Sequence, residues 1–264
     1  MAFSCKYFGM SRSGYYKWLT ATTSSRNLRQ IELKNLIESC FERSGKTYGS
    51  PRVYNELLKL KFHISENTVA KYMREMNISA KIKRRFKVET TDSNHKGPIA
   101  PRIFKIEETK PHGPREIWAG DITYVPFGDK FLYLSVVLDV YNRKIVGWSL
   151  DDSLDTQGVL NAIKMAFQRE GDKAKIIFHS DRGCQYASKE YRDFLGGKLA
   201  IPSMSRKGNC YDNSLVESFF KTFKSELIYR KRFENVSQLK SEIFYYIECW
   251  YNVNHLTSTH FQNH

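Results

Sequence analysis

Apolar residues in the first 80 positions recur at helical spacing. This spacing, together with the serine and proline residues that start helices, predicts helical segments at 11–18, at 27–43, from Ser50 onward, and at 66–76. The last two are short, closely connected and set in a basic segment, which predicts a helix-turn-helix region. Its second helix would present Asn67, Lys71 and Arg74 for reading bases. Such helix pairs are also common as plain core elements, so the pattern alone leaves nucleic-acid binding open.

Beyond residue 115 the spacing of apolar residues becomes strand-like. Three strands, then a helix, a strand, a helix, a strand and a long helix are predicted at 117–127, 131–140, 143–150, 156–169, 175–180, 188–195, 198–203 and 212–229. The run Ile176-Ile177-Phe178 is typical of a central strand covered on both faces. This order predicts an α/β fold, a ribonuclease-H-like core with a mixed five-stranded sheet and flanking helices, preceded by the small all-α helix-turn-helix region.

Residues 81–114 differ from both neighbouring regions. They open with a basic run that includes Lys83, Arg84 and Arg85, and they continue with polar residues and prolines. We interpret them as an extended linker whose positive charge suits a DNA backbone, with an ordinary solvated charge run as the alternative. The predicted organisation is a helical DNA-binding region (1–80), a basic linker (81–114) and an α/β core with an atypical tail (115–264).

The net charge of +14 is unevenly distributed along the chain. Residues 1–110 contain 22 Lys and Arg against 10 Asp and Glu, whereas residues 111–264 contain 20 against 18. A concentrated basic region binds phosphates and releases their counterions, which indicates DNA as the partner. A basic surface that serves only solubility is the alternative.

Cysteine usage and hydropathy limit where the protein works. The five cysteines are scattered, with no CxxC pair, which argues against a zinc site or a disulfide framework: Cys5, Cys40, Cys184, Cys210 and Cys249. A reducing, intracellular setting fits this usage. Since no apolar run approaches the about 18–20 residues of a membrane span and no signal-peptide pattern opens the chain, we expect a soluble cytoplasmic protein.

Three acidic residues are candidates for a common site. Asp121 lies within the first strand, Asp181 directly follows the central strand, and Glu217 lies on the last helix. Parallel neighbouring strands would bring the two aspartates together. Converging carboxylates repel one another unless a hard cation such as Mg²⁺ is present, and two ions about 4 Å apart support phosphodiester displacement. Each residue alone is weak evidence, because a strand-end aspartate is more often a turn former, as we expect of Asp139.

The helix that carries Glu217 has two distinct faces. At about 100° per residue, Asn213, Lys221 and Lys224 share the face of Glu217. The opposite face holds the apolar residues Leu215, Phe219 and Phe223. A glutamate flanked by lysines suits a metal site with DNA alongside it. An ordinary amphipathic helix with a salt-bridged surface is the alternative.

A series of motifs resembles one protein family. They include Ser11-Arg12-Ser13-Gly14-Tyr15-Tyr16, Tyr48-Gly49-Ser50-Pro51-Arg52, Arg143-Lys144-Ile145-Val146-Gly147-Trp148, His179-Ser180-Asp181-Arg182-Gly183, and the stretches 118–124, 138–140 and 212–226. In this order they resemble bacterial insertion-sequence transposases of the OrfB type, which share the retroviral-integrase catalytic core. The resemblance runs from Cys5 to Asn252, nearly the whole chain.

The resemblance implies a DDE-type DNA transposase that cleaves and joins strands at the ends of an insertion sequence. The family's catalytic acids fall on Asp121, Asp181 and Glu217, which would hold two Mg²⁺ ions, with Mn²⁺ as a substitute. Its basic residue associated with DNA-end binding falls on Lys224. The family works as multimers on paired element ends, so we expect a homo-oligomer bound to element and target DNA near the bacterial nucleoid.

Two departures from the family pattern leave alternatives open. Cys184 stands where relatives usually have serine. The tail from Tyr251-Asn252 onward also lacks the family's usual residues, and we interpret it as truncated or frame-disrupted. One alternative is therefore a catalytically impaired remnant that only binds DNA or represses the intact enzyme. Another is a nuclease of the same fold that cleaves DNA without joining it.

Overall fold

The computed structural model divides the chain into two compact units, Met1–Ile82 and Lys83–His264. It describes residues 5, 7–20, 24–80, 97–105, 108–172, 175–206 and 213–254. The basic residues Lys83, Arg84 and Arg85 lie outside the described residues. Within the described part of the chain, no helix is both long and apolar enough to cross a membrane.

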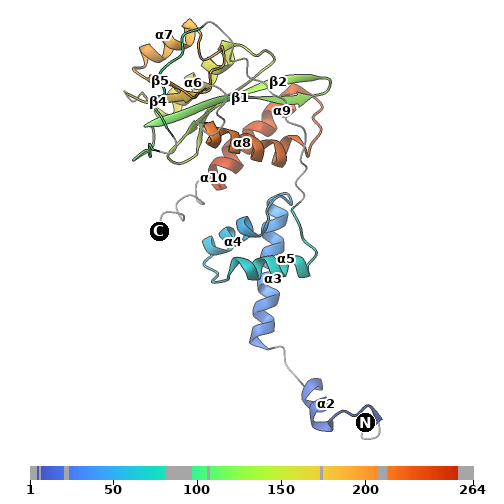
Figure 1. The fold of residues 1–264 in the computed structure, drawn as a ribbon. Helices are drawn as coiled ribbons and strands as arrows, with labels where there is room; N and C mark the ends of the chain where they lie inside the picture. Colours follow the sequence, from blue (N-terminus) through green and yellow to red (C-terminus); the bar gives the residue numbers. More distant parts are fainter. Residues whose placement is uncertain are drawn as a thin grey trace. The chain divides into compact units, whose positions relative to one another are not determined.

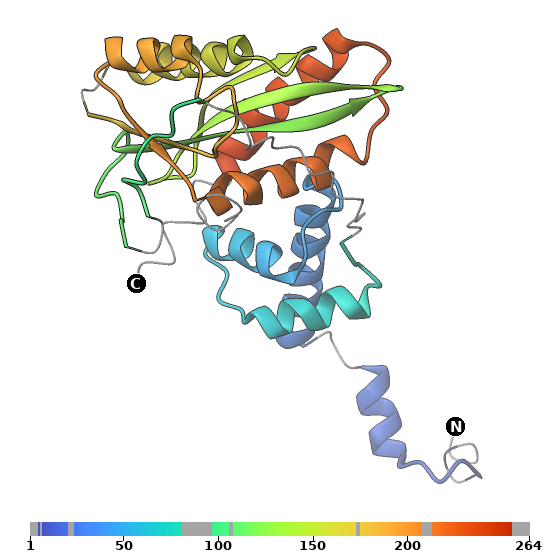
Figure 2. The same cartoon turned by 45° about the horizontal axis from the view of Figure 1, so that its top comes forward.

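The first unit is helical, as the sequence predicts. Its described helices are α2 (Arg12–Leu19), α3 (Ser25–Arg43), α4 (Ser50–Lys59) and α5 (Glu66–Glu75) (Figure 1). The last three pack against one another (Figure 2) around buried Ile37, Val53, Leu57 and Val69. Ser65 starts α5 by accepting a hydrogen bond from the Thr68 amide. The short helix pair α4–α5 thus has its own apolar core.

The second unit contains a five-stranded sheet in the order β3-β2-β1-β4-β5. The strands are β1 (Ile117–Phe127), β2 (Lys130–Asp139), β3 (Ile145–Asp151), β4 (Ile177–Ser180) and β5 (Ile201–Met204). The first three form an antiparallel meander, and β4 and β5 extend it in parallel from β1. This mixed sheet is the predicted ribonuclease-H-like arrangement.

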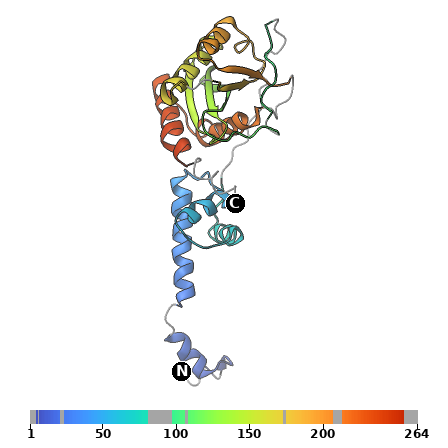
Figure 3. The same ribbon diagram turned by 90° about the vertical axis from the view of Figure 1, so that its left-hand side faces the viewer.

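Helices cover both faces of the sheet (Figures 1 and 3). One face packs against α6 (Thr156–Glu170) and α7 (Lys189–Gly197). The other packs against α8 (Ser214–Phe223), η2 (Lys224–Ile228), α9 (Val236–Phe244) and η3 (Tyr245–Tyr251), which leads into α10 (Asn252–Asn254). Gly147 lets α6 approach closely, because a Cβ atom there would collide with the backbone of Ala162. Each face of the sheet therefore has its own apolar core.

The C-terminal region departs from the prediction of one long helix over 212–229. In the structure α8 ends at Phe223 and continues as the π-helical segment η2. The wider turn lets Leu227 and Ile228, which are adjacent in sequence, both be buried with Phe223. The helices α9 and η3 were not predicted, although they complete the core on that face.

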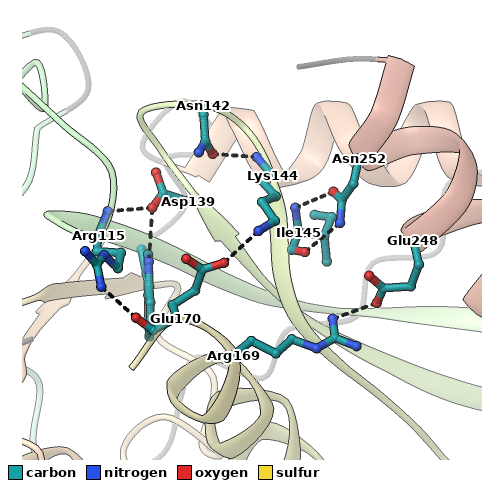
Figure 4. Close-up of polar contacts among 10 residues, drawn as sticks. Arg115, Asp139, Asn142, Lys144, Ile145, Arg169, Glu170, Glu248 and Asn252 are labelled. Carbon is teal, nitrogen blue, oxygen red and sulfur yellow. Dashed lines mark hydrogen bonds and ion pairs between the residues drawn. The ribbon is translucent and has the colours of Figure 1, made fainter. Parts of the chain in front are cut away.

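Hydrogen bonds tie these last helices to the edge strand β3 (Figure 4). The Asn252 side chain bonds both backbone groups of Ile145, as acceptor from N–H and as donor to C=O, each at 2.9 Å. Glu248 accepts hydrogen bonds from Trp148 Nε1 at 2.8 Å and from Arg169 at 2.7 Å. The C-terminal segment therefore completes the backbone hydrogen bonding of β3 at Ile145.

Candidate active site

The pairing of β1 with β4 places Asp121 and Asp181 at the same end of the sheet. The last paired residues are Ala119 and His179, and each aspartate follows two residues beyond its member of this pair. Because the strands are parallel, the two residues lie at the same end of the paired segment, Asp121 within β1 and Asp181 directly after β4. The prediction that parallel neighbours bring these two acids together agrees with the observed register.

Backbone amides hold the two aspartate side chains. Asp121 is half-buried, and its Oδ1 accepts a hydrogen bond of 2.8 Å from the Ile122 amide. Asp181 Oδ1 accepts one of 2.9 Å from the Gly183 amide, in the turn that follows β4. Both carboxylates are thus oriented by the chain segments next to them.

Glu217 comes from α8, which contacts β1. Its side chain is one-third exposed, and its carboxylate lies 3.6 Å from the ammonium group of Lys221, one turn further along the helix. Lys221 is largely exposed. On the other side of the helix Phe219 and Phe223 are buried in the core, so the predicted apolar face of this helix is confirmed.

The acids act on one another electrostatically. Burial raises the pKa of Asp121 well above its usual value, and the negative charges of Asp181 and Glu217 raise it further. The hydrogen bond from Ile122 and the positive charge of Lys224 act in the opposite direction. Burial in turn lowers the pKa of Lys224, which the charge of Asp121 partly offsets. Asp121 therefore lies within the electrostatic influence of all three other groups.

The three acids are less closely grouped than the ligands of a bound metal ion. Among the described residues, no group of three or more His, Cys, Asp or Glu side chains is gathered so that it could hold a metal ion. The structure thus brings the acids into one region without enclosing a single point between them. Repulsion among unneutralised carboxylates favours such a separation.

Asp139 lies outside this region and forms a turn, as the sequence predicts. Its Oδ2 accepts hydrogen bonds from the Arg115 amide at 2.7 Å (Figure 4) and from Trp118 Nε1 at 3.3 Å. Its Oδ1 accepts one from the Tyr141 amide at 3.0 Å. Asp139 thus fixes the β2–β3 turn to the start of β1.

The candidate base-reading residues share the exposed surface of α5. Asn67, Lys71 and Arg74 are all exposed. Lys71 lies 3.9 Å from the Glu75 carboxylate, and Arg74 Nε donates to the carbonyl of Ala70 at 3.3 Å. This surface belongs to the first unit, whereas the acids belong to the second.

The residues around Gly120 were given no role from sequence. Tyr186 is buried, and its hydroxyl lies 3.5 Å from the position that a Gly120 Cβ would occupy. Burial, followed by the charges of Asp121 and Asp181, raises the pKa of Tyr186 well above its usual value. Asn213 reaches Gly120 from α8, with Nδ2 donating to the glycine carbonyl at 3.3 Å. The signal for Asn213 in the sequence was its position in the stretch 212–226, whereas Tyr186 lies outside the motifs.

Models of known protein families match most of the chain. An integrase core domain family matches residues 111–210 and 217–264, and an HTH-like domain family matches residues 28–86. The catalytic domain of Mos1 mariner transposase is 17% identical, with 55% of this chain and 78% of that one covered and a TM-score of 0.41.

Two relatives match almost the entire chain. The insertion element IS600 uncharacterized 31 kDa protein of Shigella sonnei is 37% identical over 248 residues, which cover 94% of this chain and 90% of that protein. Transposase InsF for insertion sequence IS3A of Escherichia coli (strain K12) is 35% identical over 250 residues, 94% of this chain and 86% of that protein. The protein therefore belongs to the family of insertion-sequence DNA transposases with an integrase-type catalytic core.

Proposed function

We propose that Asp121, Asp181 and Glu217 are the catalytic residues with which this transposase cleaves and joins DNA at the ends of an insertion sequence. The observation that carries the proposal is the register of β1 and β4, which places Asp121 and Asp181 each two residues beyond the last parallel pair, with Glu217 close enough to raise the pKa of Asp121. Like charges gathered in a partly buried site destabilise the fold unless a proton or a cation offsets them. We infer that a cation does so here.

The donor set fits a divalent cation. Catalytic cores of integrases and transposases depend on divalent metal ions, and Mg²⁺, or Mn²⁺ in its place, prefers carboxylate oxygens. The buried Oδ1 of Asn213 receives no hydrogen bond within the described part of the chain, so it could accept one from a further donor. We assign two ions to Asp121, Asp181 and Glu217. When bound, they activate the attacking oxygen and stabilise the leaving oxygen of the phosphodiester.

The two lysines of the same helix would bind DNA phosphates beside the acids. Lys224 is half-buried and interacts electrostatically with Asp121, which suits a phosphate close to the cleaved bond. Lys221 is largely exposed and suits a phosphate further out. Together they would align the strand while the acids hold the ions.

The first unit would recognise the DNA sequence. We propose that α5 reads bases through Asn67, Lys71 and Arg74, and that the basic run with Lys83, Arg84 and Arg85 follows the DNA backbone. The chain would then be organised as a DNA-binding region (1–80), a linker (81–114) and a catalytic core (115–264). Since two element ends must be joined to one target, we propose a homo-oligomeric complex working on DNA in the cytoplasm.

Amide variants of the three acids test the assignment. Replacing Asp121→Asn, Asp181→Asn or Glu217→Gln removes an anionic ligand but keeps the side-chain shape. We expect DNA cleavage and strand transfer with Mg²⁺ or Mn²⁺ to fall by about 10³-fold or more. Binding to element-end DNA should stay within about threefold, because docking depends on basic residues.

Asp129→Asn, in the exposed β1–β2 turn, is the matched control and should keep full activity. Near-normal strand transfer by any one of the three amide variants would remove that residue from the catalytic set. A wild-type protein that binds ends without cleaving them would be a DNA-binding remnant. One that cleaves without joining would be a nuclease.

A further inference from the structure

The first residue of the α8 region, Asn213, uses its side chain differently from the other helix-capping residues. Six helices of the described chain begin with a side chain that accepts a hydrogen bond from the amide three residues later; the capping residues are Ser11, Ser24, Ser65, Asp155, Ser188 and Asn235. Asn213 makes no such bond to its own helix. Its side chain is directed to another element instead.

That element is β1, at the residue before Asp121. Asn213 Nδ2 donates to the carbonyl oxygen of Gly120 at 3.3 Å. The carbonyl can only accept, which identifies the nitrogen as the atom that faces it. Glu217 follows Asn213 by four residues, about one helical turn. A single side chain thus links the backbone next to Asp121 with the helical turn that carries Glu217.

Gly120 is also held by aromatic side chains. A Cβ atom at Gly120 would lie 2.8 Å from the ring of Phe178 and 3.5 Å from the hydroxyl of Tyr186. Both aromatic residues are buried, and they belong to β4 and to the turn region after it. With these contacts and the Asn213 amide, Gly120 has little freedom to move, and neither does Asp121 after it.

The oxygen of the same amide has no donor. Asn213 is only 6% exposed, and its Oδ1 is buried without a hydrogen bond from any described residue. Leaving a buried amide oxygen unsatisfied is unfavourable, and folded proteins normally supply a partner. The neighbouring acids can only accept when ionised. Among the residues that the structure describes, none supplies the missing donor.

We propose that Asn213 is a positioning residue of the catalytic site: its Nδ2 holds Gly120 and hence Asp121 against the turn of α8 that carries Glu217, and its Oδ1 accepts a hydrogen bond from the hydration shell of the divalent cation. This inference rests on the proposed metal site. Residues that orient metal ligands in this way typically affect metal affinity by about 10- to 100-fold.

Asn213→Leu separates this role from a purely structural one. Leucine has the same branched shape and removes the unsatisfied oxygen, although the Gly120 carbonyl loses its donor, so the melting temperature of the metal-free full-length protein should change by less than about 3 °C. The affinity for Mn²⁺ alone, measured by calorimetry, should fall by about tenfold or more. The value of kcat for strand transfer should fall, while KM for element-end DNA stays unchanged.

Asn235→Ala is the matched control. It removes the asparagine that caps α9, whose Oδ1 accepts a hydrogen bond from the Gln238 amide. It should lower the melting temperature by about 2–4 °C and leave the Mn²⁺ affinity unchanged. If Asn213→Leu fails to fold, Asn213→Ala, which cannot clash, takes its place.

Wild-type Mn²⁺ affinity in a folded Asn213 variant would overturn the inference. So would unfolding of both Asn213 variants, since the residue would then act on the fold alone. A wild-type protein that binds no Mn²⁺, or an Asp181→Asn variant that binds it equally well, would instead reject the proposed metal site. The two failures are therefore distinguishable.

Discussion

Asp121 and Asp139 lie on neighbouring strands of one sheet, and burial raises the pKa of both carboxyl groups. Their surroundings differ in every other respect. Asp139 accepts hydrogen bonds from two backbone amides and from the indole of Trp118. Asp121 accepts one, from the next residue in its own strand.

The difference shows that Asp139 serves the fold, and it is consistent with the catalytic role that we propose for Asp121. Hydrogen bonds to Asp139 partly offset the effect of burial on its pKa. Around Asp121 the charges of Asp181 and Glu217 add to the effect of burial. We therefore distinguish a closed corner, made of Asp139 and its donors, from an open end that contains the three acids.

The first prediction tests the closed corner and has the largest expected effect on stability. Asp139→Asn keeps the shape but turns an NH₂ group toward hydrogen-bond donors that now lack an acceptor. Unfolding by denaturant should show a loss of about 2–3 kcal/mol. Asp129→Asn, at an exposed turn, should show none. If Asp139→Asn were as stable as the wild type, the donors around Asp139 would not be what secures this corner.

The second prediction extends the comparison to the edge strand, where a neutral side chain satisfies the backbone. Asn252→Ala removes both hydrogen bonds to Ile145 and leaves two buried backbone groups unpaired. We expect a loss of about 1–3 kcal/mol in the free energy of unfolding. Asn254 Nδ2 donates to the carbonyl of Trp250, four residues earlier in the adjoining η3 segment. Asn254→Ala should therefore cost much less, and an equal loss in both variants would contradict the argument.

Much of this fold could be predicted from the sequence because its signals are local. The strand β1 was predicted with its observed limits, Ile117–Phe127, and the Gly128-Asp129 turn follows from residue type. The three acids were predicted because positions in strands and on helix faces determine where side chains emerge, and their catalytic role stays a prediction. Asp139 was correctly interpreted as a turn former for the same local reason.

The remainder depends on contacts between distant parts of the chain. The π-helical turn at Lys224 follows from packing in the core and not from a local sequence pattern, since it lets both Leu227 and Ile228 reach the apolar side. Asn252 and Ile145 are 107 residues apart, and the sequence around each of them carries no pattern that predicts the hydrogen bonds between them. The link from Asn213 to Gly120 spans 93 residues. Sequence placed Asn213 on the correct helix face but could not show what it holds.

The last prediction concerns Asp121 at the open end, where we expect a substitution to stabilise the metal-free protein instead of destabilising it. A carboxyl group whose pKa is raised in the folded state binds its proton more tightly there, so the fold loses stability as pH rises above the unfolded value of about 4. Asp121→Asn does not titrate and avoids this loss. In EDTA at pH 7 it should be more stable than the wild type, and near pH 4 the two should be equal. Adding Mg²⁺ should stabilise the wild type and leave Asp121→Asn unchanged. Denaturant unfolding at both pH values measures this, and a metal-free Asp121→Asn protein less stable than the wild type at pH 7 would show that Asp121, like Asp139, serves the fold.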